Sequence, residues 1–295
     1  MILRAGCPSP SRRPSLLFAL LACLLGLGWS LPTTVSAQAP PNPDDPLNEA
    51  LATTIVVRAV GHGSLVLGRE VGGARVTIAN ATTGELLASG IQQGEAGDQN
   101  HIMRTPHVMR EPLYSSTPTA AFTTTLYLSA PMQVLLTVEG PLAYPSAMQR
   151  ASTTVWLSPG QHMTGDGIVI PLYGYIVQIE SPAKGATLIA RDDVKLRASV
   201  RTLSGAPIRP HGDWDARGIG IFAEVLIDGR VTDRLQMFYA GEGGKYDASF
   251  FVPRQELAPN GLVVRVVATN PTDGNAGVAE EAYTVLTERR PPKKP

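Results

Sequence analysis

Hydrophobic and polar residues alternate with a period of two along much of this chain, the pattern expected of β-strands that bury one face. The clearest example is the stretch 72–90, in which Ala74, Val76 and Ile78 share one face. Residues 80–84 (NATTG) then supply the residue types of a tight turn before a second short strand. This stretch predicts a β-hairpin.

The other strands are expected in two groups. A β-branched segment at 53–60 begins the first group, and Trp156 is expected to fill its core. Regular spacing, turn signals between strands and no helix longer than a couple of turns predict an all-β protein of two consecutive antiparallel β-sandwiches. The remaining strands are expected at 121–128, 132–139, 152–157 and 167–172 in the first group, and at 194–201, 219–227, 234–239, 245–252, 262–269 and 279–286 in the second.

The length of 295 residues is also enough for two domains of about 100 to 130 residues each. The predicted boundaries place the first sandwich at 53–173 and the second at 174–287. A long segment at 91–118 interrupts the first sandwich after its hairpin. Because long loops in compact domains are either functional or disordered, a specific activity is expected there first.

Two short motifs carry a resemblance to known families. The GGARVTI strand, ATTGE turn and LLASG strand within 53–92 resemble the carboxypeptidase regulatory-like, transthyretin-like sandwich of secreted bacterial proteins. The GKY strand at 244–246 and the ATNPTDGN turn at 268–275 resemble bacterial immunoglobulin-like or fibronectin-III-like modules. The resemblance implies a transthyretin-like sandwich followed by an immunoglobulin-like one, and no particular activity.

The N-terminus has the features of a cleaved signal peptide at 1–37: three arginines, an apolar run at 15–31 and small residues before Gln38. A single membrane anchor, a twin-arginine signal and a lipobox that would lipidate Cys23 are the alternatives. The prediction is an exported protein, periplasmic or extracellular, with no transmembrane segment in the mature chain.

The two ends of the mature chain have the composition of linkers. A Pro-rich, polar stretch at 38–52 predicts a flexible leader, and 288–295 is a basic, Pro-rich tail. When the seven basic residues of the signal and the tail are set aside, 18 of the 25 basic residues remain against 25 acidic ones. This mildly acidic balance argues against nucleic acid as a partner.

Both cysteines, Cys7 and Cys23, lie in the predicted signal peptide. The mature chain therefore has no disulfide, no thiolate zinc site and no cysteine nucleophile. Nucleophile-elbow, HExxH and phosphate-loop patterns are also missing from the sequence. The prediction is a protein that is not an enzyme. Sugar binding on an aromatic platform is poorly supported, because Trp156 and Trp214 both have core interpretations.

The long segment contains a near repeat, His101-x-Met103 and His107-x-Met109. Imidazole with thioether is a ligand set that suits copper, particularly Cu(I). In an extended segment, residues i and i+2 point the same way, so each pair could close on one ion. The alternative is that Ile102, Met103, Val108 and Met109 are apolar anchors that pin the loop to the sandwich, with the histidines at its surface. His162-Met163 offers a third pairing of the same kind.

A second cluster of polar residues is found at His211, Asp213 and Asp215. These side chains could bind a divalent metal or perform acid–base chemistry, or the aspartates could cap turns through the backbone. The turn-capping interpretation is favoured.

Calcium is a further candidate ligand. Asp273 and Asn275, with Asp192 and Asp193, could supply oxygen ligands at one end of the second sandwich. Ordinary hairpin-turn chemistry explains the Asp-Gly-Asn sequence at 273–275 without an ion.

These observations favour an exported, non-catalytic binding or assembly module of the cell envelope that contacts a protein partner through edge strands and the long loop. One alternative is a periplasmic copper-binding or copper-handling protein that uses the two His-x-Met motifs. Another is an unrecognised enzyme or an enzyme accessory domain. The pattern indicates neither the oligomeric state nor the identity of the partner.

Overall fold

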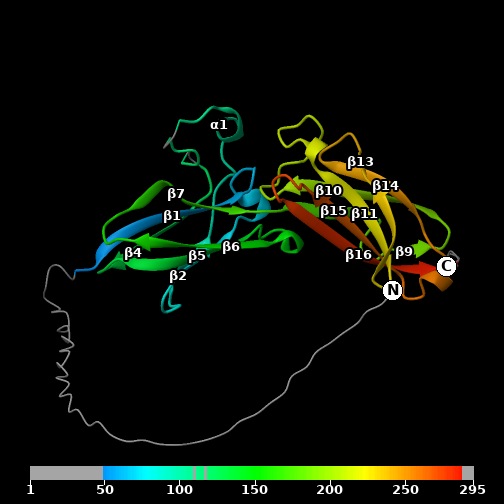
Figure 1. Ribbon diagram of the computed structural model, residues 1–295, viewed down its shortest axis with the longest axis horizontal. Coiled ribbons are helices and arrows are strands. Elements are labelled where there is room, and N and C mark those ends of the chain that lie inside the picture. Colours follow the sequence, from blue (N-terminus) through cyan, green and yellow to red (C-terminus); the bar gives the residue numbers. More distant parts are fainter. Residues whose placement is uncertain (1–48, 109–110, 116–117, 288–295) are drawn as a thin grey trace, which may run out of the picture. The chain divides into compact units, whose positions relative to one another are not determined.

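The computed structural model describes residues 49–108, 111–115 and 118–287, all within one compact unit that spans Asn42–Pro295. Regular structure in these residues is almost entirely β-strand, arranged in four sheets (Figure 1). Two sheets enclose one hydrophobic core and two enclose another. The prediction of an all-β protein with two sandwiches is confirmed. The predicted signal peptide, most of the leader and the basic tail lie outside the described residues.

The first sandwich packs a three-stranded sheet, β4-β1-β7, against a four-stranded sheet, β3-β2-β5-β6. Buried residues alternate along the strands, so that Val76 and Ile78 of the predicted hairpin face the same core as Leu136. The strands are β1 Leu51–Gly61, β2 Arg75–Asn80, β3 Leu86–Ile91, β4 Phe122–Leu128, β5 Met132–Gly140, β6 Gln149–Leu157 and β7 Met163–Leu172, with short 3-10 turns at Arg69–Val71 and Pro145–Ala147.

One pairing in this sandwich departs from the antiparallel expectation. β1 and β7, the first and last strands of the sandwich, run parallel. Their register shifts between Ile55 and Val57, opposite Gly167. Gly167 has a φ of 67°, and a Cβ there would lie 2.2 Å from the carbonyl oxygen of Val56. The close approach of the two strands therefore requires glycine at this position.

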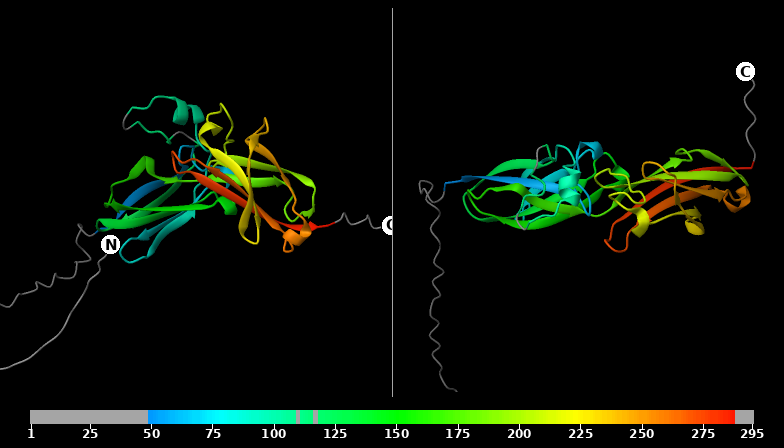
Figure 2. Two further views of the ribbon diagram at one scale, coloured as in Figure 1. Left: turned by 45° about the vertical axis from the view of Figure 1, so that its right-hand side comes forward. Right: turned by 90° about the horizontal axis from the view of Figure 1, so that it is seen from above.

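The second sandwich packs β13-β14-β10-β8 against β12-β11-β15-β16-β9, and its strands can be followed from green to red in Figure 2. β8 and β9 were not expected, because β8 follows the first sandwich almost directly and β9 has three residues. The strands are β8 Tyr175–Ser181, β9 Thr187–Ile189, β10 Asp193–Thr202, β11 Gly220–Ile227, β12 Arg230–Gln236, β13 Phe238–Tyr239, β14 Lys245–Phe251, β15 Leu262–Thr269 and β16 Ala276–Leu286, with 3-10 turns η4 Ala216–Gly218 and η5 Gln255–Leu257.

Trp156 does not fill the first core as expected. The side chains of β6 alternate between the two faces, and Leu157, at 1% exposure, occupies the core position. Trp156 therefore falls on the outward face, opposite Gln133 of β5, and is 65% exposed. A shift of one residue reverses the side of the sheet on which a strand residue lies, which is why the pattern misplaced this tryptophan.

Contacts cross the predicted boundary between residues 173 and 174. Ile176 of β8 and Leu203, which follows β10, are both 1% exposed and belong to the first core. The Ser64 and Ser204 hydroxyls lie 2.6 Å apart, and the Trp214 indole donates a hydrogen bond to the Gly63 carbonyl. The domain limits stay a prediction, because the two sandwiches belong to the same compact unit.

No helix in the part of the chain that the structure describes is long and apolar enough to cross a membrane.

Candidate functional site

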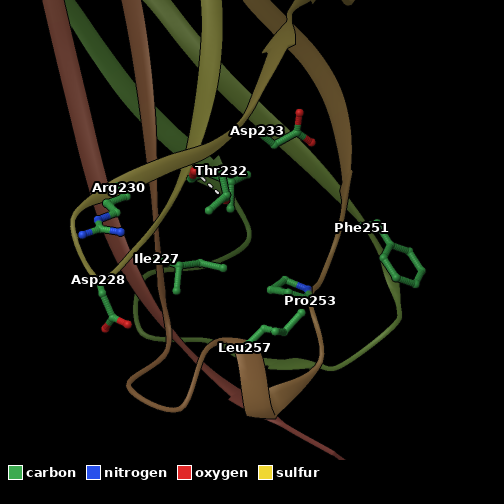
Figure 3. Close-up of a pocket in the computed structure, with 9 residues that line it drawn as sticks. Ile227, Asp228, Arg230, Thr232, Asp233, Phe251, Pro253 and Leu257 are labelled. Atoms are coloured by element: carbon green, nitrogen blue, oxygen red, sulfur yellow. Dashed lines mark hydrogen bonds between the residues drawn. The ribbon is translucent and has the colours of Figure 1, made fainter.

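An apolar groove opens on the second sandwich, between the β11–β12 hairpin and the segment that leads from β14 into η5 (Figure 3). Its volume is about 650 Å³. Figure 3 shows Ile227 on one wall, with Pro253 and Leu257 across the hollow from it. The groove is lined by Val225, Ile227, Asp228, Arg230, Thr232, Asp233, Phe251, Pro253 and Leu257.

The apolar wall follows from the ends of β14 and η5. Tyr246 and Phe250 of β14 point into the second core and are buried. Phe251, the next residue, falls on the opposite face and is 63% exposed. Leu257 at the end of η5 is also 63% exposed. Two large apolar side chains thus face solvent at one hollow, where burial by a ligand would remove them from water.

The opposite wall is set by the hairpin turn. Asp228 and Gly229 have φ values of 46° and 76°, as a two-residue turn with both central residues left-handed requires. The Asn260 carboxamide donates to the Asp228 carboxylate over 3.2 Å. The Thr232 hydroxyl donates to the Val225 carbonyl over 3.0 Å, across a register shift in the hairpin (Figure 3). The wall is therefore held in place before any ligand arrives.

An edge strand borders the same groove. β12 is the last strand of its sheet and pairs with β11 on one side. Most of its residues are exposed, and Arg230 and Asp233 place charges beside the apolar hollow. An edge strand offers main-chain hydrogen bonds to an added segment, and an adjoining pocket can take its side chains. The arrangement suits an extended polypeptide segment with an apolar side chain.

The long segment after the first hairpin adopts a different local structure from the one expected. Residues Gln99–Arg104 form a short helix, α1, whose N-terminus is capped by the Asp98 carboxylate through the amides of Asn100 and His101. Residues i and i+2 of a helix do not face each other, so the expectation that His101 and Met103 point the same way is wrong. The helix replaces the extended conformation because Asp98 supplies the cap.

The structure brings the two predicted histidines of this segment together instead. The His101 and His107 rings meet edge to face, with centroids 5.1 Å apart. His101 Nε2 also lies 3.5 Å from the Pro112 carbonyl oxygen. Met103 is 37% exposed and Met109 lies outside the described residues. The copper site itself stays a prediction.

Of the apolar anchors predicted for this loop, Ile102 is buried, whereas Met103 and Val108 are exposed and Met109 lies outside the described residues. Ile102 is 8% exposed and packs against Gly97. A Cβ added to Gly97 would lie 2.7 Å from Ile102 Cδ1. Farther along, the Asp166 carboxylate accepts from the amides of Leu113 and Tyr114, each over 2.6 Å. The loop is fixed at both ends by these contacts.

His162 and Met163, the third His-Met pairing, lie where β7 begins beside β1. His162 Nδ1 accepts a hydrogen bond from the Thr54 amide of β1 over 3.0 Å, and Met163 begins β7. That ring nitrogen is therefore already used by the main chain.

The aspartates of the second predicted cluster are engaged by arginines. Asp215 caps η4 and pairs with Arg217, whose side-chain hydrogen bonds lower the pKa of Asp215 to about 2. Asp213 accepts from Arg104 and Gln99 of α1. The hydrogen bonds of Asp215 to backbone amides fit the turn-capping interpretation, whereas Asp213 accepts from side chains of a distant segment; both carboxylates are poorly placed for acid–base work.

The proposed calcium ligands are not brought together. Asp193 lies at the end of β10 that pairs with Phe251, whereas Asn275 accepts from the Gly174 amide, near the other end of β10. Asp273 Oδ1 accepts from the Asn275 amide over 2.8 Å, as turn chemistry predicts. Within the described ranges, no group of three or more His, Cys, Asp or Glu side chains is placed to hold a metal ion.

The apolar groove was missed by sequence reasoning. A signal for it exists at Phe250-Phe251-Val252-Pro253, because two successive aromatic residues at a strand end cannot both face the core. The exposed member of such a pair, here Phe251, is an apolar side chain outside the core and therefore indicates a candidate binding surface.

The sequence matches no protein-family model and no curated protein. Its structure is similar to fibronectin(III)-like modules of Clostridium thermocellum CbhA, with 10% identity over 81% of this chain and 94% of that chain and a TM-score of 0.25. It is also similar to three N-terminal domains of the bacteriophage RB49 outer capsid protein Hoc, with 14% identity over 80% of this chain and 59% of that chain and a TM-score of 0.26. It is also similar to the ectodomain of mouse nectin-like molecule 4, with 11% identity over 82% of this chain and 67% of that chain and a TM-score of 0.22. At TM-scores this low the likenesses carry no argument about function. The transthyretin-like and immunoglobulin-like resemblances stay predictions.

Proposed function

We propose that this protein is an exported, non-catalytic binding module of the cell envelope, and that the apolar groove of the second sandwich receives a segment of a protein partner. The observation that supports the proposal is the exposure of Phe251 and Leu257, 63% each, at a preformed hollow beside the edge strand β12. Burying these two side chains would contribute about 1.5 to 3 kcal/mol each before the costs of association.

The partner is a protein because the groove combines two kinds of contact. The edge of β12 can pair with the main chain of an extended segment, and the hollow can hold one of its apolar side chains. Asp228, Arg230 and Asp233 at the rim can select the charge of flanking residues.

In-cell photo-cross-linking tests this proposal. A benzoylphenylalanine placed at position 251 should form a covalent adduct with one protein, identified by mass spectrometry. The matched control carries the same group at position 86, because Leu86 on β3 is 61% exposed but far from the groove in the topology. Leu257→Asp should remove the adduct at 251. Equal adducts at both positions, or adducts unaffected by Leu257→Asp, would contradict the proposal.

Export is part of the same proposal. Cleavage after Ala37 would leave Gln38 at the N-terminus, and the protein would be recovered from the periplasm or the medium. N-terminal sequencing of the protein purified from its native host checks this. A lipidated Cys23 at the N-terminus would instead support the lipobox alternative.

The contact between His101 and His107 favours a second candidate function, copper binding. Two imidazole rings with centroids 5.1 Å apart could share one ion after ring rotation, and Met109 of the second motif is the thioether ligand that the hypothesis requires. A Cu(I) titration against a competing chelator tests this hypothesis, with His101→Ala and His107→Ala as variants. His211→Asn is the control, because this exposed histidine has a φ of 57°, which asparagine tolerates. Binding no tighter than micromolar would reject it.

A further inference from the structure

A second hollow lies on the first sandwich, around the turn between β4 and β5. Its volume is about 410 Å³. Two aromatic side chains at this hollow face solvent: Tyr127 of β4 is 74% exposed and Trp156 of β6 is 65% exposed. The residues that line it are Asn80, Thr82, Thr83, Tyr127, Leu128, Ser129, Ala130, Pro131, Met132, Gln133 and Trp156.

The walls of this aromatic groove are set by hydrogen bonds of the fold. Gln133 lies directly opposite Trp156 in the β5–β6 ladder, so both side chains stand on the outward face of the sheet. The Ala81 amide donates to the Gln133 carbonyl over 2.9 Å, which holds the β2–β3 turn against β5. The Asn80 carboxamide oxygen accepts from the Thr82 amide over 2.8 Å. The groove is therefore preorganised.

The chemistry of this groove is neutral. None of the residues that line it is charged, in contrast to the apolar groove with its Asp228, Arg230 and Asp233. The Gln133 carboxamide and the Trp156 indole N–H make no hydrogen bond to other described residues, and neither does the Thr82 hydroxyl. These groups offer both donors and acceptors at a hollow that Tyr127 and Trp156 also line.

We propose that this aromatic groove binds a neutral oligosaccharide. A sugar ring presents an apolar C–H face that packs on an aromatic ring and hydroxyls that both donate and accept hydrogen bonds. A charged ligand would find no opposite charge among the lining residues. A proline-rich peptide would also pack on aromatic rings, but proline has no N–H to donate to the Gln133 and Thr82 oxygens.

Affinity electrophoresis of the mature protein tests the proposal. Native gels contain hydroxyethylcellulose, glucomannan, amylopectin or dextran, and at least one of these should retard the protein. Trp156→Ala and Tyr127→Ala should each weaken the binding by about tenfold or more. Phe238→Ala is the matched control, because Phe238 on β13 is an aromatic residue that is 70% exposed on the second sandwich. Since all three side chains are exposed, the variants should fold.

The outcomes separate this proposal from its alternatives. Failure of all four polysaccharides to retard the protein would overturn it, as would equal loss of retardation in Phe238→Ala. A synthetic peptide with the sequence of residues 38–49 is titrated in parallel, with tryptophan fluorescence as the readout. If that peptide binds and the polysaccharides do not, the groove is a peptide site and the proposal is wrong. The photo-cross-linking result at position 251 is independent of either outcome.

Discussion

A single carboxylate, Glu224, joins three strands of the second sandwich. It lies opposite Arg234 on β12 and opposite Arg265 on β15, with nitrogen–oxygen distances of 2.6 and 3.2 Å. Arg265 also pairs with Glu280 on β16, so that charges alternate across the sheet. The hydrogen bonds from Arg234, followed by those from Arg265, lower the pKa of Glu224.

This lowered pKa predicts a loss of stability in acid. The stabilisation is fully present above the unfolded-state value of about 4.3 and is lost as the pH falls through the lower folded-state pKa. Glu224→Gln should lower the free energy of unfolding by about 1 to 2 kcal/mol at pH 7 and should flatten its decline between about pH 5 and 3. Urea denaturation at several pH values checks this. The exposed Glu85→Gln is the control, and an unchanged pH dependence in Glu224→Gln would contradict the prediction.

Gln92 is a buried polar residue whose amide is fully used. Its side-chain oxygen accepts from the Ala59 amide over 2.6 Å, and its nitrogen donates to the carbonyls of Ala59 and Leu67 over 3.1 and 2.9 Å. Gln92→Leu should destabilise the protein by about 2 to 4 kcal/mol, because the Ala59 amide and the Leu67 carbonyl would lose the hydrogen bonds that Gln92 makes to them. The neighbouring Gln93 is exposed, so Gln93→Leu should change the free energy of unfolding by less than about 0.5 kcal/mol. If equilibrium denaturation gives equal changes in the free energy of unfolding for Gln92→Leu and Gln93→Leu, the hydrogen bonds of Gln92 contribute little to stability.

At the level of elements, the predicted apolar anchors in the loop that contains α1 differ in burial. Ile102 is buried, whereas Met103 is more than a third exposed. Ile102→Ala should therefore raise the hydrogen-exchange rates of the amides in Gln99–Arg104 at least tenfold, and Met103→Ala should leave them nearly unchanged. If Met103→Ala has the larger effect on these exchange rates, Met103 rather than Ile102 anchors the helix, and the prediction is wrong.

Strand positions were largely predictable because alternation, β-branched residues and turn chemistry are local signals. The expected strand at 262–269 coincides with β15, and the expected turn at 80–84 lies between β2 and β3. Local signals could not show which of two adjacent residues faces the core, so Trp156 was misplaced and Phe251 was overlooked. The helix at 99–104 was missed because its stability depends on a cap and on one buried side chain.

The candidate sites were less predictable than the strands, because each depends on residues that are distant in the sequence. The aromatic groove gathers residues from the β2–β3 turn, the β4–β5 turn and β6. The pairing of Asp213 with Arg104 spans 109 positions. His101 and His107 are close in the sequence, yet their contact requires α1 to turn the chain back. Pattern alone identified the residue types and could not supply the pairings.

For the molecule as a whole, the two cores are coupled through single strands. On β8, Tyr175 and Val177 face the second core, and Ile176 between them faces the first. β10 contributes to the second core, and Leu203, directly after it, is buried in the first. Opposite faces of one strand thus serve two cores, and the unfolding of one sandwich removes packing from the other.

This coupling predicts one cooperative unfolding transition for the wild-type protein. Leu203→Ala should lower the stability by about 2 to 5 kcal/mol and separate the unfolding into two steps, because it removes a contact shared by the two sandwiches. Calorimetry counts the transitions. Leu196→Ala is the control, since Leu196 is buried in the second core alone and should destabilise without separating the transitions. Two transitions in the wild type would show that Ile176 and Leu203 fill the first core without coupling it to the second.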